Sequence, residues 1–247
     1  MNILINPLFV GIIQTLLSVV ILSGFLFFGR IINSNFFKNY QNILFDFLIS
    51  IIIFSQILKV FSYLEFFKQI NLILSISIII FGIYNLLYVY NFLRTIKFKF
   101  PKNLFEIIIF LFIFLLFIIS ISPPSMADAL DYHYGIPLYL LKFNELPDPY
   151  LWIHGTLANN GEIINALALY LGTDNFGSLI QFFALLLFIF FLSEKVQDKK
   201  KLVFLIIFII CSPTLLQLIS GPKFLLFPQI LTTSALLILI DKNKINI

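Results

Sequence analysis

Hydrophobic residues run along this chain in long blocks that short polar segments separate. A helix that crosses the hydrocarbon core of a bilayer needs about 20 apolar residues. The pattern predicts about seven such spans and therefore an all-α, polytopic transmembrane helix bundle. The seven predicted spans are Leu8–Phe28, Ile43–Phe61, Ile70–Tyr90, Leu104–Ile121, Phe176–Leu192, Leu202–Ile219 and Phe224–Ile240.

One long segment, residues 122–175, interrupts this pattern. It holds both histidines, the single tryptophan and six of the twelve acidic residues. We predict one long external loop with short helices on the membrane surface, because a separate domain of this size is marginal without disulfides or metal. Leu138–Phe143 should form one such helix behind Pro137. Glu162–Leu171 should form another, with one apolar face along the bilayer surface.

Composition and charge agree with a membrane protein. Hydrophobic residues make up 60% of the chain and charged residues 11%, far below the ~25% of soluble domains. The net charge of +4 arises from basic residues that mostly follow the first, third, fifth and seventh predicted spans. Because basic loops stay cytoplasmic, this places the N-terminus outside, the C-terminus in the cytoplasm and the acidic segment outside. The charge is therefore a topology signal, and no nucleic-acid partner is predicted.

Two charged residues fall within or near the ends of the second predicted span. Asp46 and Lys59 are 13 residues apart, or ~20 Å along a helix, so they cannot pair with each other within it. We interpret both as interface residues whose charged ends reach toward the headgroups. The alternative is a buried functional charge.

The acidic segment also carries the candidate chemistry. Asp128 and Asp131 are three residues apart, so on a helix they are neighbours on one face. Two close carboxylates can act as acid and base or share a cation. His133 and His154 lack the short spacing of metal ligands, so no metal is predicted, and a divalent cation stays an open option. The plain alternative is a solvated acidic face.

The stretch Pro123–His133 resembles the first external loop of the GT-C superfamily of polytopic membrane glycosyltransferases. Asp128, Tyr132 and His133 match an Asp-(Ser/Ala)-(Met/Leu)-x-Tyr-His pattern of bacterial members, and Asp131 falls on its variable position. The resemblance covers roughly residues 104–192. It implies an inverting transfer of a sugar from a polyprenyl-phosphate or pyrophosphate carrier to a glycan, lipid or protein acceptor in the cell envelope. No cofactor is required.

Under this resemblance, Asp128 is the expected catalytic base and Asp131 the alternative. The candidate substrate-binding residues lie around them, and Lys223 is the expected partner of the phosphate. They are Tyr132, His133, His154, Glu162 and Lys223. Each also has a structural interpretation. Tyr132 suits a membrane-interface anchor, Glu162 suits a helix N-terminus, and Lys223 suits an ordinary loop lysine.

The resemblance also divides the chain. We predict N-terminal transmembrane helices in residues 1–103, a GT-C-like unit in 104–192 and C-terminal transmembrane helices in 193–247. Only three spans follow the matching one, so a truncated member is one interpretation. The expected location is the bacterial cytoplasmic membrane.

A function of another class is a non-enzymatic membrane component, such as a transporter, a flippase or an inactive subunit. A transporter should place polar groups near mid-membrane. Here the polarity lies in residues 122–175, which favours an enzyme.

Overall fold

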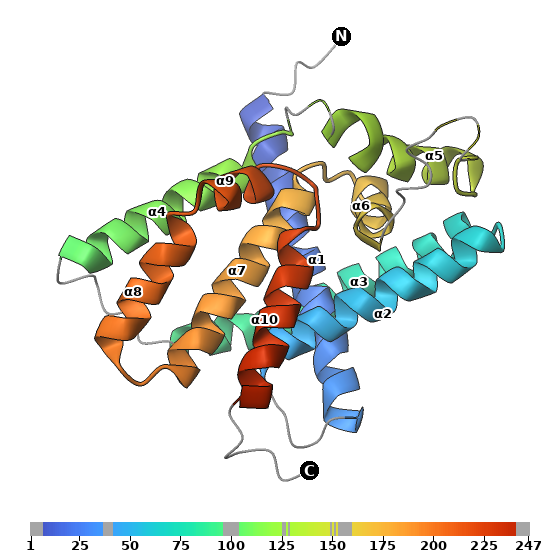
Figure 1. Cartoon of the computed structure of the whole chain (residues 1–247). Helices are drawn as coiled ribbons and strands as arrows, with labels where there is room; N and C mark the ends of the chain where they lie inside the picture. The colour runs from blue at the N-terminus through green and yellow to red at the C-terminus, as the bar shows by residue number, and fades with distance from the viewer. Residues whose placement is uncertain are drawn as a thin grey trace.

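The computed structural model describes residues 7–36, 42–95, 104–124, 127, 129–148, 150, 152 and 160–240. Within these residues every regular element is a helix and no strand occurs. Five helices are long and apolar enough to cross a membrane. The prediction of an all-helical, multi-pass membrane protein is therefore confirmed (Figure 1).

The first three helices pack together as one unit. They are α1 (Pro7–Phe36), α2 (Ile43–Tyr63) and α3 (Phe67–Thr95), and α1 contacts both of the others. Two glycines allow α1 and α3 to approach each other closely. A Cβ at Gly24 or Gly82 would collide with a backbone oxygen of the partner helix, Ile78 or Val20 respectively. Small residues at such crossings bring helix backbones together, which supports packing within a membrane.

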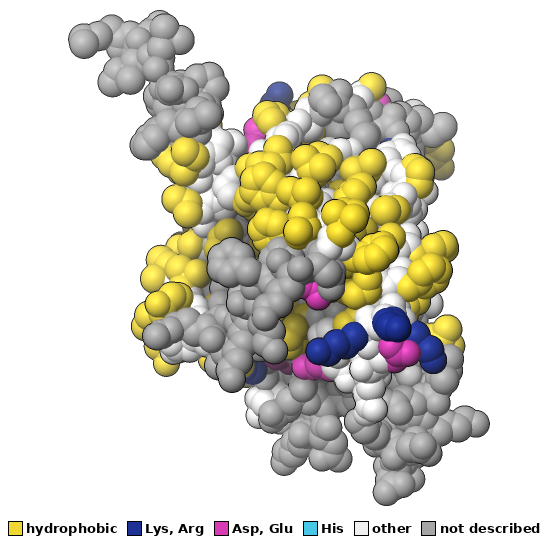
Figure 2. All heavy atoms as spheres, turned by 90° about the vertical axis from the view of Figure 1, so that its left-hand side faces the viewer, with side chains coloured by type: hydrophobic (Ala, Val, Ile, Leu, Met, Phe, Trp, Pro, Cys, Tyr) yellow, Lys and Arg dark blue, Asp and Glu magenta, His cyan; other side chains and the backbone are white. Residues whose placement is uncertain are grey.

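The C-terminal helices gather around α7 (Phe176–Lys195). They are α4 (Leu104–Ile121), α8 (Lys199–Ile210), α9 (Pro213–Ile219) and α10 (Leu226–Ile240). Of the apolar stretch of α7, 72% is buried, against 11% for α4. Figure 2 shows the resulting hydrophobic surface on the side of the molecule where α4 and α8 lie. This surface suits contact with lipid.

By length and composition, fewer helices qualify as membrane spans than the seven predicted. Among the described residues, α8 and α9 join only as a pair bent by 64°, which would give six spans. The chain breaks at Cys211 and Ser212, and Pro213 then begins α9. Proline lacks the N–H that would continue the ladder, so it starts a helix readily and interrupts one. The predicted seventh span is helical, but α10 has only 15 residues.

The segment between α4 and α7 forms three short helical elements. These are a π-helical turn, η1 (Ala129–His133), then α5 (Gly135–Phe143) and α6 (Asn160–Tyr170). The end of α5 is tied to the start of α3, since the side chain of Asn144 accepts a hydrogen bond from the backbone N–H of Lys68 at 2.7 Å. The segment therefore packs on the N-terminal helices.

The helix predicted at Glu162–Leu171 is present as α6, and its burial extends beyond the predicted apolar face. Every residue of α6 from Gly161 to Ala168 is buried. Helices α2, α5 and α7 all pack against α6, so the flanking elements cover the side that an amphipathic surface helix would leave open.

Candidate functional site

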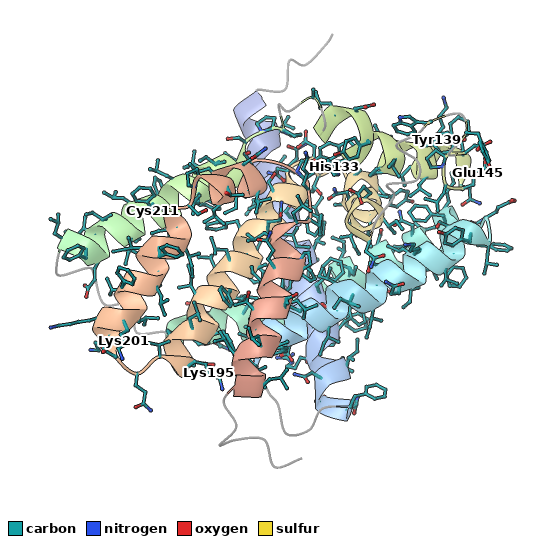
Figure 3. All side chains as sticks on the ribbon, in the orientation of Figure 1. His133, Tyr139, Glu145, Lys195, Lys201 and Cys211 are labelled. Carbon is teal, nitrogen blue, oxygen red and sulfur yellow. The ribbon has the colours of Figure 1, made fainter. Side chains whose placement is uncertain are left out.

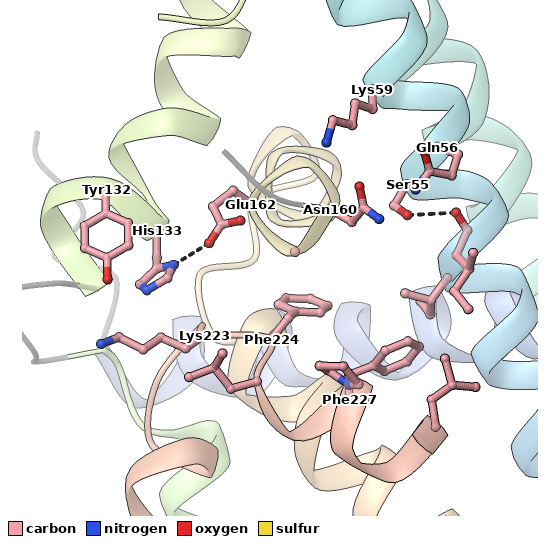
Figure 4. Close-up of a pocket in the computed structure, with 16 residues that line it drawn as sticks. Ser55, Gln56, Lys59, Tyr132, His133, Asn160, Glu162, Lys223, Phe224 and Phe227 are labelled. Carbon is pink, nitrogen blue, oxygen red and sulfur yellow. Dashed lines mark hydrogen bonds and ion pairs between the residues drawn. The ribbon is translucent and has the colours of Figure 1, made fainter. Parts of the chain in front are cut away.

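A cavity of about 610 Å³ opens between α2, α6, η1 and the segment that leads into α10 (Figure 4). This size is within the range of small-molecule sites. Four of the residues singled out in the sequence line it: Tyr132, His133, Glu162 and Lys223. They come from three separate elements, so the fold brings them together. We call it the His133 cavity.

The centre of the site is a buried pair between His133 and Glu162. Nδ1 of His133 lies 2.5 Å from Oε1 of Glu162, and the two residues are 7% and 5% exposed. A buried carboxylate needs a hydrogen-bond donor or a counter-charge, and the imidazole supplies it. The other ring nitrogen, Nε2, is buried without a hydrogen-bond partner in the described structure. Nδ1 of His133 is thus bonded to Glu162, whereas Nε2 lacks a hydrogen-bond partner among the described residues.

Local structure holds this pair in place. The ring of Tyr132 lies against that of His133, with 4.1 Å between the ring centroids. Glu162 belongs to the first turn of α6, where the helix dipole favours a carboxylate. Gly161 allows α6 to approach the neighbouring segment, because a Cβ there would lie 2.6 Å from Cβ of Phe224. A larger residue at Gly161 would push α6 away from the segment that carries Lys223.

The segment that carries Lys223 is held by α7. Gln181, fully buried in α7, donates from Nε2 to the backbone oxygens of Leu218 at 2.6 Å and Gly221 at 2.8 Å. Its Oε1 accepts from the backbone N–H of Leu226 at 3.2 Å. These bonds span both ends of the connection from α9 to α10. One glutamine therefore fixes the position of the backbone on either side of Lys223.

Lys59 also lines the His133 cavity. Snorkelling toward the headgroups is therefore an incomplete account of this residue. Its face of α2 could have been recognised from the sequence, since Ile51, Ser55 and Lys59 are four residues apart and lie on one side of a helix. The spacing within one span does not show which residues face it across a cavity, so it does not indicate a site by itself.

Tyr134 is a structural neighbour of the site. Its hydroxyl donates to the backbone oxygen of Asp174. Burial, and secondarily the Asp174 carboxylate, raise the pKa of the Tyr134 phenol well above its usual value. The phenol therefore keeps its proton and ties the end of η1 to the start of α7.

The other sequence-predicted residues lie elsewhere. Asp131 is in η1 and exposed, and it is not among the residues that line the cavity. Asp128 and His154 lie outside the described residues, so their predicted roles stay predictions. Within the part of the chain that the structure describes, no group of three His, Cys, Asp or Glu side chains could hold a metal ion.

A second cavity, of about 490 Å³, contains Arg30, Asp46 and Glu194, and we call it the Arg30 cavity. Its polar groups bond to neighbouring side chains. Asn33 donates to Asp46 at 2.6 Å, and Asn42 donates to Glu194 at 3.0 Å. The guanidinium of Arg30 donates to Asn85 at 3.1 Å and lies 3.8 Å from the ring centroid of Tyr88. We interpret this cluster as a structural connection among α1, α2, α3 and α7.

The comparisons with known proteins give a family and no close relative. The family model of the DUF1420 N-terminal domain matches residues 96–246. No curated protein and no solved structure matches the chain. The matched stretch includes His133, Glu162 and Lys223 but begins after Lys59 in α2. Because the match covers more than half of the chain, this protein belongs to the DUF1420 N-terminal domain family.

Proposed function

We propose that this protein is an inverting membrane glycosyltransferase. It transfers a sugar from a polyprenyl-phosphate or pyrophosphate carrier to a glycan, lipid or protein acceptor of the cell envelope. The observation that supports this most is the His133 cavity, which gathers Tyr132, His133, Glu162 and Lys223 beside the predicted catalytic segment. A transferase of this type needs such a polar site at the edge of an apolar helix bundle.

The proposed membrane topology follows the charge pattern. We propose that the five long apolar helices, the bent pair α8–α9 and the shorter α10 make seven spans in the bacterial cytoplasmic membrane. Residues 122–175 and the N-terminus then lie outside and the C-terminus lies in the cytoplasm. In Figure 3, Lys195 and Lys201 lie toward the opposite end of the helix bundle from His133 and Glu145. This arrangement supports the separation of the basic loops from the acidic segment. Basic loops remain on the cytoplasmic side.

The chemistry assigns a role to each charged group. The carboxylate of Asp128, or of Asp131 as the alternative, takes the proton of the acceptor hydroxyl. The acceptor oxygen then forms a bond to the anomeric carbon while the bond from that carbon to the phosphate oxygen breaks. The departing phosphate oxygen keeps the electron pair, and Lys223 stabilises its charge. The products are the glycosylated acceptor and the polyprenyl phosphate or pyrophosphate.

The test is transfer of radiolabelled sugar from a polyprenyl-phosphate donor in membranes that contain the full gene product. Asp128→Asn should reduce transfer by about 100-fold or more and leave expression and insertion unchanged, because it removes the base and nearly keeps the shape. Asp131→Asn should reduce transfer by a smaller factor. Glu145→Gln is the matched control, since Glu145 is exposed in the same segment and does not line the cavity.

Two results would change the proposal. Loss of transfer only in Asp131→Asn would move the base to Asp131. Full transfer by both variants, singly and together, would remove the catalytic role of these carboxylates. Absence of transfer by the wild-type protein would favour a non-enzymatic membrane component.

A further inference from the structure

The exposed face of α8 carries two shallow cavities that meet. One, of about 420 Å³, is lined by Lys200, Lys201, Phe204 and Leu205. The other, of about 490 Å³, extends from Phe204 to the bend that follows α8. Because Phe204 lines both, they form one continuous groove, which we call the Lys201 groove. In Figure 3, Lys201 and Cys211 lie near the two ends of α8.

The Lys201 groove has the length of one membrane leaflet. Lys201 and Cys211 are ten residues apart along α8 and its C-cap, which is about 15 Å of helix axis. The hydrocarbon core of a bilayer is ~30 Å thick, so one leaflet contributes ~15 Å. Between these two residues, Phe204 is 70% exposed and Phe208 is 74% exposed. An acyl chain that lies along these rings would therefore reach from the lysines to the bend.

The lysine end of the groove is cationic. Residues 194–201 contain four lysines and only two acidic residues, Glu194 and Asp198. Both carboxylates already accept hydrogen bonds, that of Glu194 from Asn42 and that of Asp198 from backbone N–H groups of α8. The three lysines at 199–201 are exposed. Figure 2 shows basic side chains directly below the broad hydrophobic surface on this side of the molecule.

We propose that the Lys201 groove binds an anionic phospholipid. The phosphate of the lipid lies at Lys200 and Lys201, and one acyl chain lies along Phe204 and Phe208 toward the bend. Clustered lysines immediately beside a membrane attract anionic headgroups. An apolar groove alone would accept any lipid, and a lysine cluster alone would accept any anion. Only an anionic lipid matches both ends of the groove.

The lipid site is separate from the His133 cavity, because no residue lines both. It therefore does not depend on the proposed transfer of sugar. In the proposed topology the lysines face the cytoplasm, so the lipid belongs to the cytoplasmic leaflet. A lipid bound there holds the turn between α7 and α8 at the level of the headgroups.

The single cysteine of the chain allows a local measurement, since Cys211 is exposed and lines the far end of the groove. A small fluorophore is attached to Cys211 in the full chain, which is then reconstituted in phosphatidylcholine vesicles. Quenching by phosphatidylglycerol with brominated acyl chains is compared with quenching by brominated phosphatidylcholine at equal mole fraction. We expect phosphatidylglycerol to associate at this position about fivefold more strongly or better.

Substitution of both Lys200 and Lys201 by glutamine should remove this preference, because the remaining lysines of 194–201 only balance Glu194 and Asp198. Substitution of both by arginine should keep the preference, since the charge stays. Lys142→Gln is the matched control, because Lys142 is exposed in α5 and does not line the Lys201 groove. It should retain the wild-type preference.

Three results would overturn the proposal. Equal quenching by the two lipids in the wild-type protein would show a groove that does not select for charge. A preference that survives the double glutamine variant would show that the lysines do not hold the headgroup. Weak quenching by both lipids would show that protein, such as a second copy of this chain, covers the groove instead of lipid.

Discussion

The His133 cavity and the Arg30 cavity contain similar residue types but differ in how these are bonded. In the Arg30 cavity, Asn33 holds Asp46, Asn42 holds Glu194, and Arg30 contacts Asn85 and Tyr88. None of the buried side-chain atoms that lack a hydrogen-bond partner in the described residues lines this cavity. Two such atoms, on His133 and Asn160, line the His133 cavity.

The presence of unsatisfied buried polar atoms distinguishes a candidate binding site from a structural cluster. Charged residues are present in both cavities, so charge does not distinguish them. Polar groups that satisfy one another stabilise helix packing, whereas buried groups left unsatisfied cost free energy that a ligand can recover. Substitutions in the two cavities should therefore have different consequences.

The largest effect is expected from Gln181→Leu, which removes the link between α7 and the segment around Lys223. Two backbone oxygens and one backbone N–H would lose their buried partner, at about 1–3 kcal/mol each. We expect a loss of about 3 kcal/mol or more in the free energy of unfolding, together with lower transfer activity. Thermal unfolding in detergent and the sugar-transfer assay measure the two effects.

Gln217→Leu is the control for this substitution, since the side chain of Gln217 is exposed in α9. It should behave like the wild type. Wild-type stability in Gln181→Leu would show that the segment around Lys223 is held by its other contacts, such as the bond from Asn165 to the oxygen of Pro222.

A smaller effect is expected from Glu162→Gln. The amide keeps the shape but removes the charge that His133 contacts at 2.5 Å, and hydrogen bonds to charged groups contribute about 1.5–3 kcal/mol. We expect about 2 kcal/mol less stability, with transfer activity reduced more than in Glu145→Gln. Thermal unfolding and the transfer assay would check this. A variant with full stability and full activity would show that the buried pair serves neither purpose.

The smallest effect is expected in the Arg30 cavity. Asn42→Ala removes the N-cap bond to the backbone N–H of Leu44 at 2.9 Å and the exposed bond to Glu194. A lost N-cap costs about 1 kcal/mol. The free energy of unfolding should fall by about this amount, while sugar transfer stays at the wild-type level. Reduced transfer by this variant, under conditions where it is fully folded, would contradict the structural interpretation of the Arg30 cavity.

Part of the site could be predicted from sequence because its signals are local. The pattern around Asp128 directed attention to Tyr132 and His133, and Lys223 stood out as a basic residue on the same predicted side. Lys59 was not assigned to the site, because its relation to Lys223 depends on how α2 and α10 lie across a cavity. The role of Gln181 also could not be predicted, since a glutamine inside an apolar span gives no indication of which backbone it bonds.

The sequence by itself determined the all-helical class, most of the apolar helices and the position of the polar segment. These follow from local hydrophobicity, which acts over one helix length at a time. Only the tertiary structure decided that α6 is buried from Gly161 to Ala168, that α8 and α9 are separated by a bend, and that His133 meets Glu162. Such features depend on contacts between residues far apart in the chain. Their energies arise from packing and from buried hydrogen bonds, which no local pattern encodes.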